Sequence, residues 1–298
     1  MKDVYIDKRR YEYTDKLLEL LFLAIAAVYM NGKRAVFVIL ITTGAYVVTD
    51  VLLSVLFERR RSSGLEFLFV PVSMSLMLSA GVPYYVPVIA GIFAFAVGQL
   101  PFGSSGRQPF SPACVGIAFV NACFYDEVNN FTQSARGESI CSASIASLLK
   151  NGSCLNIDKA NIFDVLSGNV PSPMGTGFII ILLACVIFTL LRNKKILLPL
   201  VGYISVIALC VLIFPGTQAV YLNELINELC SGAVLYCAIF FLCDEDRAPK
   251  NSIKKLLYGA VAGAALMIMK KTGSFEDPSC FAVLLANSLS GVIEKNEN

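Results

Sequence analysis

The sequence contains no histidine and no tryptophan, and charged residues make up only 15% of it. The absence of histidine removes the commonest metal ligand and excludes a histidine-ligated haem. The ten cysteines include no C-x-x-C pair, and most of them sit in or beside apolar runs. Small buried hydrophobes are the expected role for such cysteines, so we expect no metal site.

The sequence also lacks an excess of either charge, because 24 Lys and Arg residues against 22 Asp and Glu give a formal net charge of only +2. No basic patch is interleaved with aromatic residues, so we expect no nucleic-acid partner. The first sixteen residues, MKDVYIDKRRYEYTDK, are polar and charged. They do not resemble the apolar core of a secretory signal peptide, and we expect none.

Apolar residues are abundant: 56% of the chain is hydrophobic and the mean hydropathy is +0.68. An ordinary soluble domain carries about 25% charged residues and could not hide this much apolar surface. The composition therefore predicts an integral membrane protein whose solvent is the lipid bilayer.

Ten apolar segments are expected to form about ten transmembrane helices in an all-α, polytopic fold. Several are shorter than the ~20 residues that cross a bilayer as a straight helix. We divide the chain into a cytoplasmic segment 1–16, one transmembrane domain 17–293, and a tail 294–298. The segments span residues 17–30, 35–57, 66–80, 84–101, 110–124, 176–191, 197–214, 229–243, 256–270 and 279–293.

The distribution of basic residues predicts the orientation. With ten crossings and a cytoplasmic N-terminus, most of the 24 Lys and Arg residues fall in cytoplasmic connections. This bias favours a multi-pass protein of the cytoplasmic membrane with both termini in the cytoplasm. The longest connection, residues 125–175, then lies outside, and loops of this length are often functional.

A weak internal repeat divides the ten segments into two sets of five. Pro112-Ala-Cys114 opens the fifth segment, which ends near Asn121, and Pro278-Ser-Cys280 opens the tenth, which ends near Asn287. Two halves with an odd number of helices must have opposite orientations in the membrane. This is the inverted-repeat arrangement, in which binding sites lie between the halves.

The third and the eighth segments are expected to be broken helices. Pro71 lies inside the third segment and Gly81-Val-Pro83 follows it, while Gly232 lies near the start of the eighth. Interrupted segments at equivalent places suggest half-helices whose ends bind ions or line a path. A tilted or kinked ordinary helix is the alternative.

Two regions carry chemically suggestive residues. Asp50 lies within the 35–57 apolar run, where a carboxylate is costly and often functional, although it could also reach the headgroups or pair with Arg59–Arg61. The loop 101–112 is rich in Gly and Pro and could cradle an anion or a flat ring, or simply connect two helices.

Four stretches, taken together, resemble the RnfD/NqrB family, the flavin-carrying membrane subunits of ion-translocating electron-transfer complexes. The resemblance covers nearly the whole chain after about residue 17, and the motifs occur in the family's order. The stretches are Phe102-Gly-Ser-Ser-Gly-Arg-Gln-Pro-Phe-Ser-Pro-Ala113, Glu138-Ser-Ile-Cys-Ser-Ala-Ser144, Gly168-Asn-Val-Pro-Ser-Pro-Met-Gly175 and, imperfectly, Phe241-Leu-Cys-Asp244-Glu-Asp-Arg-Ala-Pro249.

This resemblance implies FMN attached through its phosphate to the residue at position 144, which is Ser144 where the family has Thr. Glu138 and Ala143 match the family motif in kind, and Ser142 replaces its Gly. Covalent FMN, noncovalent flavin and a degenerate site all remain open, and a second flavin could be carried. Further candidate cofactor-binding residues are Gly106, Pro109, Phe110, Pro112, Gly168, Asn169, Pro171 and Gly175, and Asp50 and Asp244 are candidates for the ion path.

The resemblance implies a subunit of an Rnf-like oxidoreductase complex, of ferredoxin:NAD type, that couples electron transfer through FMN to Na⁺ or H⁺ movement. Its partners would be the other subunits of that complex. Two alternatives stay open at this point. One is a solute channel or transporter of inverted-repeat fold without redox chemistry, and the other is a structural subunit with a degenerate flavin site.

Overall fold

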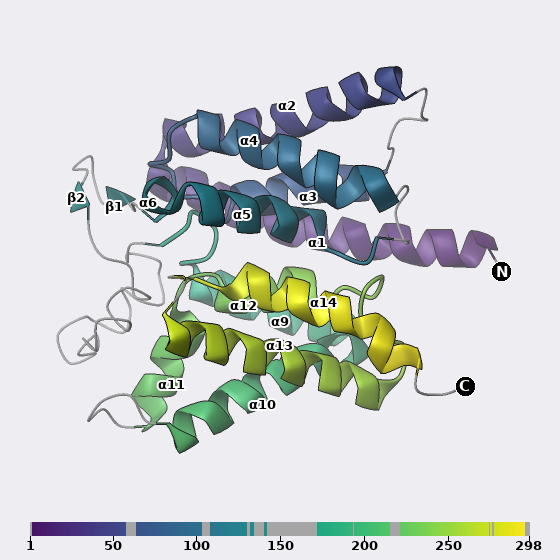
Figure 1. Ribbon diagram of the computed structural model, residues 1–298, viewed down its shortest axis with the longest axis vertical. Coiled ribbons are helices and arrows are strands. Elements are labelled where there is room, and N and C mark those ends of the chain that lie inside the picture. The colour runs from purple at the N-terminus through teal and green to yellow at the C-terminus, as the bar shows by residue number, and fades with distance from the viewer. Residues whose placement is uncertain are drawn as a thin grey trace.

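The computed structural model (Figure 1) describes residues 2–57, 64–102, 108–129, 132–133, 140–141, 172–192, 194–214, 221–273, 275 and 277–295. The first half consists of α1 (Lys2–Asn31), α2 (Lys33–Leu56), α3 (Leu65–Ser75), α4 (Tyr85–Phe93) with its continuations η1 (Ala94–Gln99) and η2 (Leu100–Phe102), α5 (Pro112–Cys123) and α6 (Tyr125–Val128). The second half consists of α9 (Ile179–Arg192), η3 (Lys194–Leu197), α10 (Leu198–Ile213), α11 (Tyr221–Cys230), α12 (Val234–Cys237), η4 (Ala238–Leu242), α13 (Ser252–Thr272) and α14 (Ser279–Lys295).

The described residues confirm an all-helical, polytopic membrane fold, because every one of the ten apolar segments overlaps a helix or a run of consecutive helices. Four of the described helical segments are long and apolar enough to cross a bilayer, and α11 with α12 and η4 makes a fifth, bent candidate. Large apolar side chains stand exposed on the outer helices, such as Leu52, Val55 and Leu191. Lipid is the solvent that suits such a surface.

One small departure from the all-α expectation lies in the long connection. Strand β1 (Thr132–Gln133) pairs antiparallel with β2 (Ile140–Cys141). In Figure 1 these strands lie at the end of the bundle opposite to the first turn of α1 and the last turn of α14. The first turn of α1 and the last turn of α14 therefore lie at the same end of the bundle.

The two halves repeat the same helix contacts. In the first half α2 packs on α4, α4 on α5, α2 on α3, and α1 on α3. In the second half α10 packs on α13, α13 on α14, α10 on η4, and α9 on η4. The halves themselves meet through equivalent helices, α1 against α9 and α5 against α14. Figure 1 shows them as two stacked groups, which is the geometry of an internal two-fold repeat.

The third segment ends early, as its sequence predicts. Helix α3 stops at Ser75 and the chain runs through turns until α4 begins. The carbonyl of Ser73 accepts a hydrogen bond from Tyr236 Oη at 2.9 Å, and that of Leu76 accepts from the backbone N–H of Gly175 at 2.7 Å. Both donors come from residues far along the chain, so distant segments satisfy the broken end.

The eighth segment is also broken. Residues 231–233 separate α11 from α12, and the two pieces meet at 63°. Gly232 has a φ of +59°, a left-handed conformation that side chains with a Cβ rarely adopt. The expectation of two interrupted helices at equivalent places is therefore met.

Helices α10 and α13 are in backbone contact. A Cβ added at Gly202 would overlap the carbonyl of Leu256, and one added at Gly259 would overlap the carbonyl oxygen of Pro199. Small residues at a helix–helix contact let backbones approach closely, which is a major source of stability when lipid removes the hydrophobic drive between helices.

We expect Gly259→Ala to destabilise the protein by about 2 kcal/mol, because the added methyl must push α13 away from α10. The measurement is denaturant unfolding in detergent followed by circular dichroism. Gly44→Ala is the matched control, since no atom lies within 4 Å of a Cβ built there. Equal losses in the two variants would contradict the backbone-contact interpretation.

Candidate functional site

A buried charge cluster joins the first helix to the turn that follows the eighth segment. Asp244 Oδ1 lies 3.1 Å from Lys16 Nζ of α1, and Asp244 Oδ2 forms an ion pair with Arg247. The side chains of Asp244 and Arg247 are 2% and 4% exposed. Helix α1 continues through position 16 without interruption, so a basic residue of the polar N-terminal stretch enters the protein interior.

Aromatic rings and a second carboxylate surround this cluster. The Lys16 ammonium lies 5.4 Å from the ring centroid of Tyr13 and 5.7 Å from that of Phe69, within the range of cation–π attraction. Tyr13 Oη donates to Asp246 Oδ2 at 2.9 Å. Lys16 is thus held by one carboxylate and two ring faces, which fixes the register of α1 against the 243–249 turn.

The electrostatics follow from burial and neighbouring charge. Burial alone would raise the pKa of the Asp244 carboxyl, but the charges of Lys16 and Arg247 outweigh it and hold that pKa below its ordinary value. Burial alone would lower the pKa of the Lys16 ammonium, but the charges of Asp244 and Glu12 outweigh it and raise that pKa. The Asp244 contribution to stability is therefore lost as pH falls through its lowered pKa, and that of Lys16 as pH rises through its raised pKa.

Two of the family-like stretches meet at Arg247. Its Nη2 donates to Gln108 Oε1 at 3.3 Å, which connects the 241–249 stretch to the 102–113 stretch. In the latter, Pro112 opens α5 and Phe110 makes an edge contact with Phe102 at 6.0 Å between ring centroids, while Pro109 is exposed.

The third stretch reaches the end of α3. Gly175 is buried, and a Cβ there would come within 2.7 Å of the Leu76 Cβ. Its backbone N–H donates to the carbonyl of Leu76, and that of Met174 donates to Leu78. The glycine at position 175 is therefore needed for close approach to the broken third segment.

The two carboxylates predicted for the ion path belong to different polar groups. Asp50 is 4% exposed on α2, and its Oδ1 accepts from Ser54 at 3.4 Å. Asp244 instead binds Lys16 and Arg247. The remaining predicted residues, Gly106, Glu138, Ala143, Ser144, Gly168, Asn169 and Pro171, lie outside the described part of the chain.

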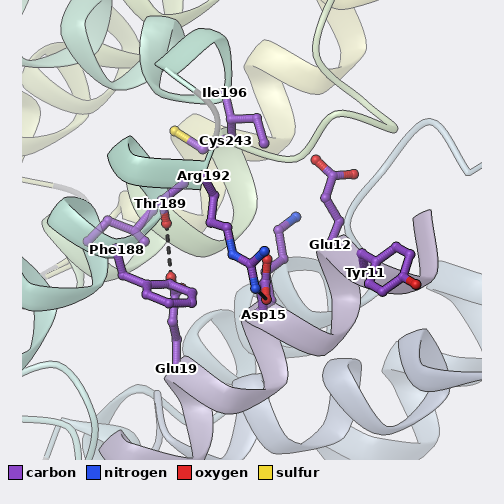
Figure 2. A pocket seen from close by; sticks show the side chains of 11 residues that line it. Tyr11, Glu12, Asp15, Glu19, Phe188, Thr189, Arg192, Ile196 and Cys243 are labelled. Carbon is purple, nitrogen blue, oxygen red and sulfur yellow. Dashed lines mark hydrogen bonds and ion pairs between the residues drawn. The ribbon is translucent and has the colours of Figure 1, made fainter. Parts of the chain in front are cut away.

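A cavity of about 220 Å³ adjoins the charge cluster between α1 and α9 (Figure 2). Thr189 Oγ1 donates to Glu19 Oε1 at 2.9 Å, and Arg192 pairs with Asp15 at 3.1 Å. The lining residues are Tyr11, Glu12, Asp15, Lys16, Glu19, Phe188, Thr189, Arg192, Ile196, Ile239 and Cys243. Carboxylate and hydroxyl oxygens of this kind suit water, protons or a small cation.

Sequence reasoning missed Glu19, Lys16 as a partner of Asp244, and Arg247. The signal for Glu19 was present, because it is a carboxylate at the start of the 17–30 apolar segment and is only 4% exposed. The Lys16–Asp244 pair spans 228 positions and leaves no local pattern. Among the described residues, no three Cys, Asp or Glu side chains are placed to hold a metal ion.

We expect Asp244→Asn to lower the free energy of unfolding by about 3 kcal/mol, because two buried cations lose their counter-charge. Asp15→Asn is the control: its partner Arg192 is 61% exposed, and the expected loss is below about 1 kcal/mol. Unfolding of both variants in detergent measures the difference.

We also expect the wild type and Asp244→Asn to lose stability to different extents in acid. Below the ordinary carboxyl pKa of 3.8, the wild type should lose the Asp244 contribution, and Asp244→Asn should show a smaller loss over that range. A wild-type-like acid loss in Asp244→Asn would show that another carboxyl carries it.

The sequence matches the NQR2, RnfD, RnfE family over residues 8–298. Similar proteins include a subunit of a proton-translocating ferredoxin:NAD(+) oxidoreductase complex from Clostridium ljungdahlii, 22% identical over 236 residues, covering 74% of this chain and 70% of that protein. A subunit of an ion-translocating oxidoreductase complex from Vibrio cholerae is 26% identical over 253 residues, covering 71% of this chain and 70% of that protein. The corresponding subunit from Mannheimia succiniciproducens is 25% identical over 263 residues, covering 74% of this chain and 73% of that protein.

The family match confirms the resemblance drawn from the four sequence stretches. It extends over almost the entire length, including the charge cluster, the cavity and both broken segments. The chain therefore belongs to the NQR2, RnfD, RnfE family.

Proposed function

We propose that this chain is the RnfD-type subunit of an Rnf-like ion-translocating oxidoreductase complex in the cytoplasmic membrane. Family membership, the names of its relatives and the polytopic helical architecture support this assignment. Its partners are the other subunits of the complex, and its enzymatic activity is that of the whole assembly, in which electron transfer drives Na⁺ or H⁺ across the membrane.

The observation that carries the proposal is the family match over residues 8–298. Within the structure, the contact between Arg247 and Gln108 agrees with it. This contact unites two family-like stretches that lie more than a hundred residues apart. The Arg247–Asp244–Lys16 ion pairs connect it to the cavity between α1 and α9. Sites in inverted-repeat membrane proteins lie between the repeats. The cavity offers a place for the coupling ion, with Glu19 on its wall and Asp244 as a fixed counter-charge next to it.

FMN is the proposed redox group, joined through its phosphate to the Ser144 hydroxyl, with Glu138 and Ala143 in the surrounding motif. A serine hydroxyl forms the same phosphoester as the threonine of the family motif. FMN supplies one- and two-electron redox chemistry when bound. The chain's part is to hold the ring near a partner's cofactor, with Gly106, Pro109, Phe110 and Pro112 and the 168–175 stretch as further candidates for contact.

The flavin test uses protein purified from its native host with its complex. We expect yellow-green fluorescence under ultraviolet light in a denaturing gel, and a peptide containing Ser144 that carries the mass of FMN. Ser144→Ala should lose both signals. Ser142→Ala, two positions earlier in the same motif, should keep them.

Flavin that is released on denaturation, with no modified peptide, would replace the covalent assignment by noncovalent binding. Complete absence of flavin from the native complex would reject the flavoprotein assignment. Full electron transfer by the assembled Ser144→Ala complex would reduce the chain to a structural subunit.

We also propose that the two termini face the cytoplasm, because most Lys and Arg residues fall in the connections that ten crossings would place on the same side as the termini. A green fluorescent protein fused after residue 298 should then fluoresce, and alkaline phosphatase fused at the same place should be inactive. The reverse pattern would invert the orientation and place the 125–175 connection in the cytoplasm.

A further inference from the structure

At the break between α11 and α12, a charged side chain forms hydrogen bonds with each of the two helix ends. On the α11 side, Lys270 from the last turn of α13 donates to Glu228 Oε2 at 2.7 Å and to Ser231 Oγ at 2.5 Å. Its third contact is the backbone carbonyl of Glu228 at 3.5 Å. All three donors of one ammonium therefore meet oxygen atoms at the end of a single helix.

On the α12 side the charge is reversed. Asp277 Oδ2 accepts from the backbone N–H of Ala233 at 2.5 Å, and Asp277 Oδ1 accepts from the N–H and the hydroxyl of Ser279 at 3.1 and 2.5 Å. A Cβ on Gly232 would come within 2.5 Å of Asp277 Oδ2. The positive end of the second half-helix is thus filled by the chain's own carboxylate.

The α11 end has the ligands of a cation site. A carboxylate, a backbone carbonyl and a hydroxyl converge on one point, and these are the oxygen donors that hold hard cations at the C-terminal ends of interrupted helices. The Lys270 and Glu228 side chains are 13% and 16% exposed, so the ion pair is shielded from solvent.

The neighbouring lysine shows that this placement is specific. Lys271, the next residue of α13, is exposed and donates to the carbonyl of Phe214 at 3.0 Å, away from the break.

One turn before Ser231 on α11, Asn227 is 3% exposed, and its amide nitrogen finds no hydrogen-bond acceptor among the described residues.

We propose that this break is a monovalent-cation site that the protein occupies with its own ammonium group, Lys270. Removing the ammonium leaves Glu228 and Ser231 to bind a small alkali cation such as Na⁺. The inference does not depend on flavin or on the identity of the coupling ion. It implies that a mobile cation reaches this break only by displacing Lys270.

The test compares Lys270→Met with Lys271→Met in full-length protein in detergent. Methionine keeps most of the length of the side chain and removes the charge. The unfolding midpoint is measured against NaCl, with choline chloride at equal ionic strength as reference. For Lys270→Met we expect a rise of about 3 °C when Na⁺ is ten times its dissociation constant, and a further logarithmic increase above that concentration. The wild type and Lys271→Met should show no Na⁺-specific rise.

A second variant ties the effect to the site. In Lys270→Met with Glu228→Gln both charges of the pair are removed together, so the helix end carries no unpaired carboxylate. This double variant should fold without Na⁺ and should lose the Na⁺-specific rise.

The outcomes separate cleanly. Folding of Lys270→Met only in the presence of Na⁺ supports the proposal as strongly as a midpoint shift. A Lys270→Met protein that folds and ignores Na⁺, or that fails to fold at any Na⁺ concentration, overturns it. An undiminished Na⁺ response in the double variant overturns it as well, because the bound ion would then lie elsewhere.

Discussion

The need to satisfy backbone hydrogen bonds where helices stop inside the bundle governs this structure. An unpaired carbonyl or N–H in an apolar environment costs several kcal/mol, and no water is at hand to replace the missing partner. The third and eighth segments are both interrupted, and polar groups at their broken ends form hydrogen bonds with residues from other segments. Tyr236 and Gly175 serve the end of α3, while Lys270 and Asp277 serve the two sides of the eighth break. The interrupted helices therefore depend on segments remote in sequence.

Charge follows the same logic as the backbone. Several buried charged side chains have partners from another element: Lys16 pairs with Asp244, Arg247 donates to Gln108 as well as to Asp244 of its own turn, and Glu19 accepts from Thr189. Buried pairs give less net stability than their attraction suggests, because both ions lose water. Their value here is positional, since these contacts set helices in register with segments remote in sequence.

Much of the fold could be predicted from sequence because it depends on local pattern. Apolar runs predict helices, and Pro71, Gly81 and Gly232 indicate where they are interrupted. The repeat of Pro112 and Pro278 predicts two halves, and the same helix contacts are found in both. Asp244 was found because it lies in a recognisable stretch. Its partners were not, because Lys16 reads locally as an ordinary basic residue before a membrane segment. The Lys270–Glu228 pair likewise depends on a 42-residue separation that no short pattern encodes. The flavin attachment remains a sequence prediction, since Ser144 lies outside the described residues.

The touching backbones of α10 and α13 bear on how the protein can move. Side chains at a helix contact can change rotamer and let one helix slide past another, but a contact made by carbonyls against glycine has no such slack. These two helices are therefore expected to move together as one rigid unit within the second half. The seam where α1 faces α9 is different, because side chains and a cavity separate the two backbones there and leave room for a change of packing.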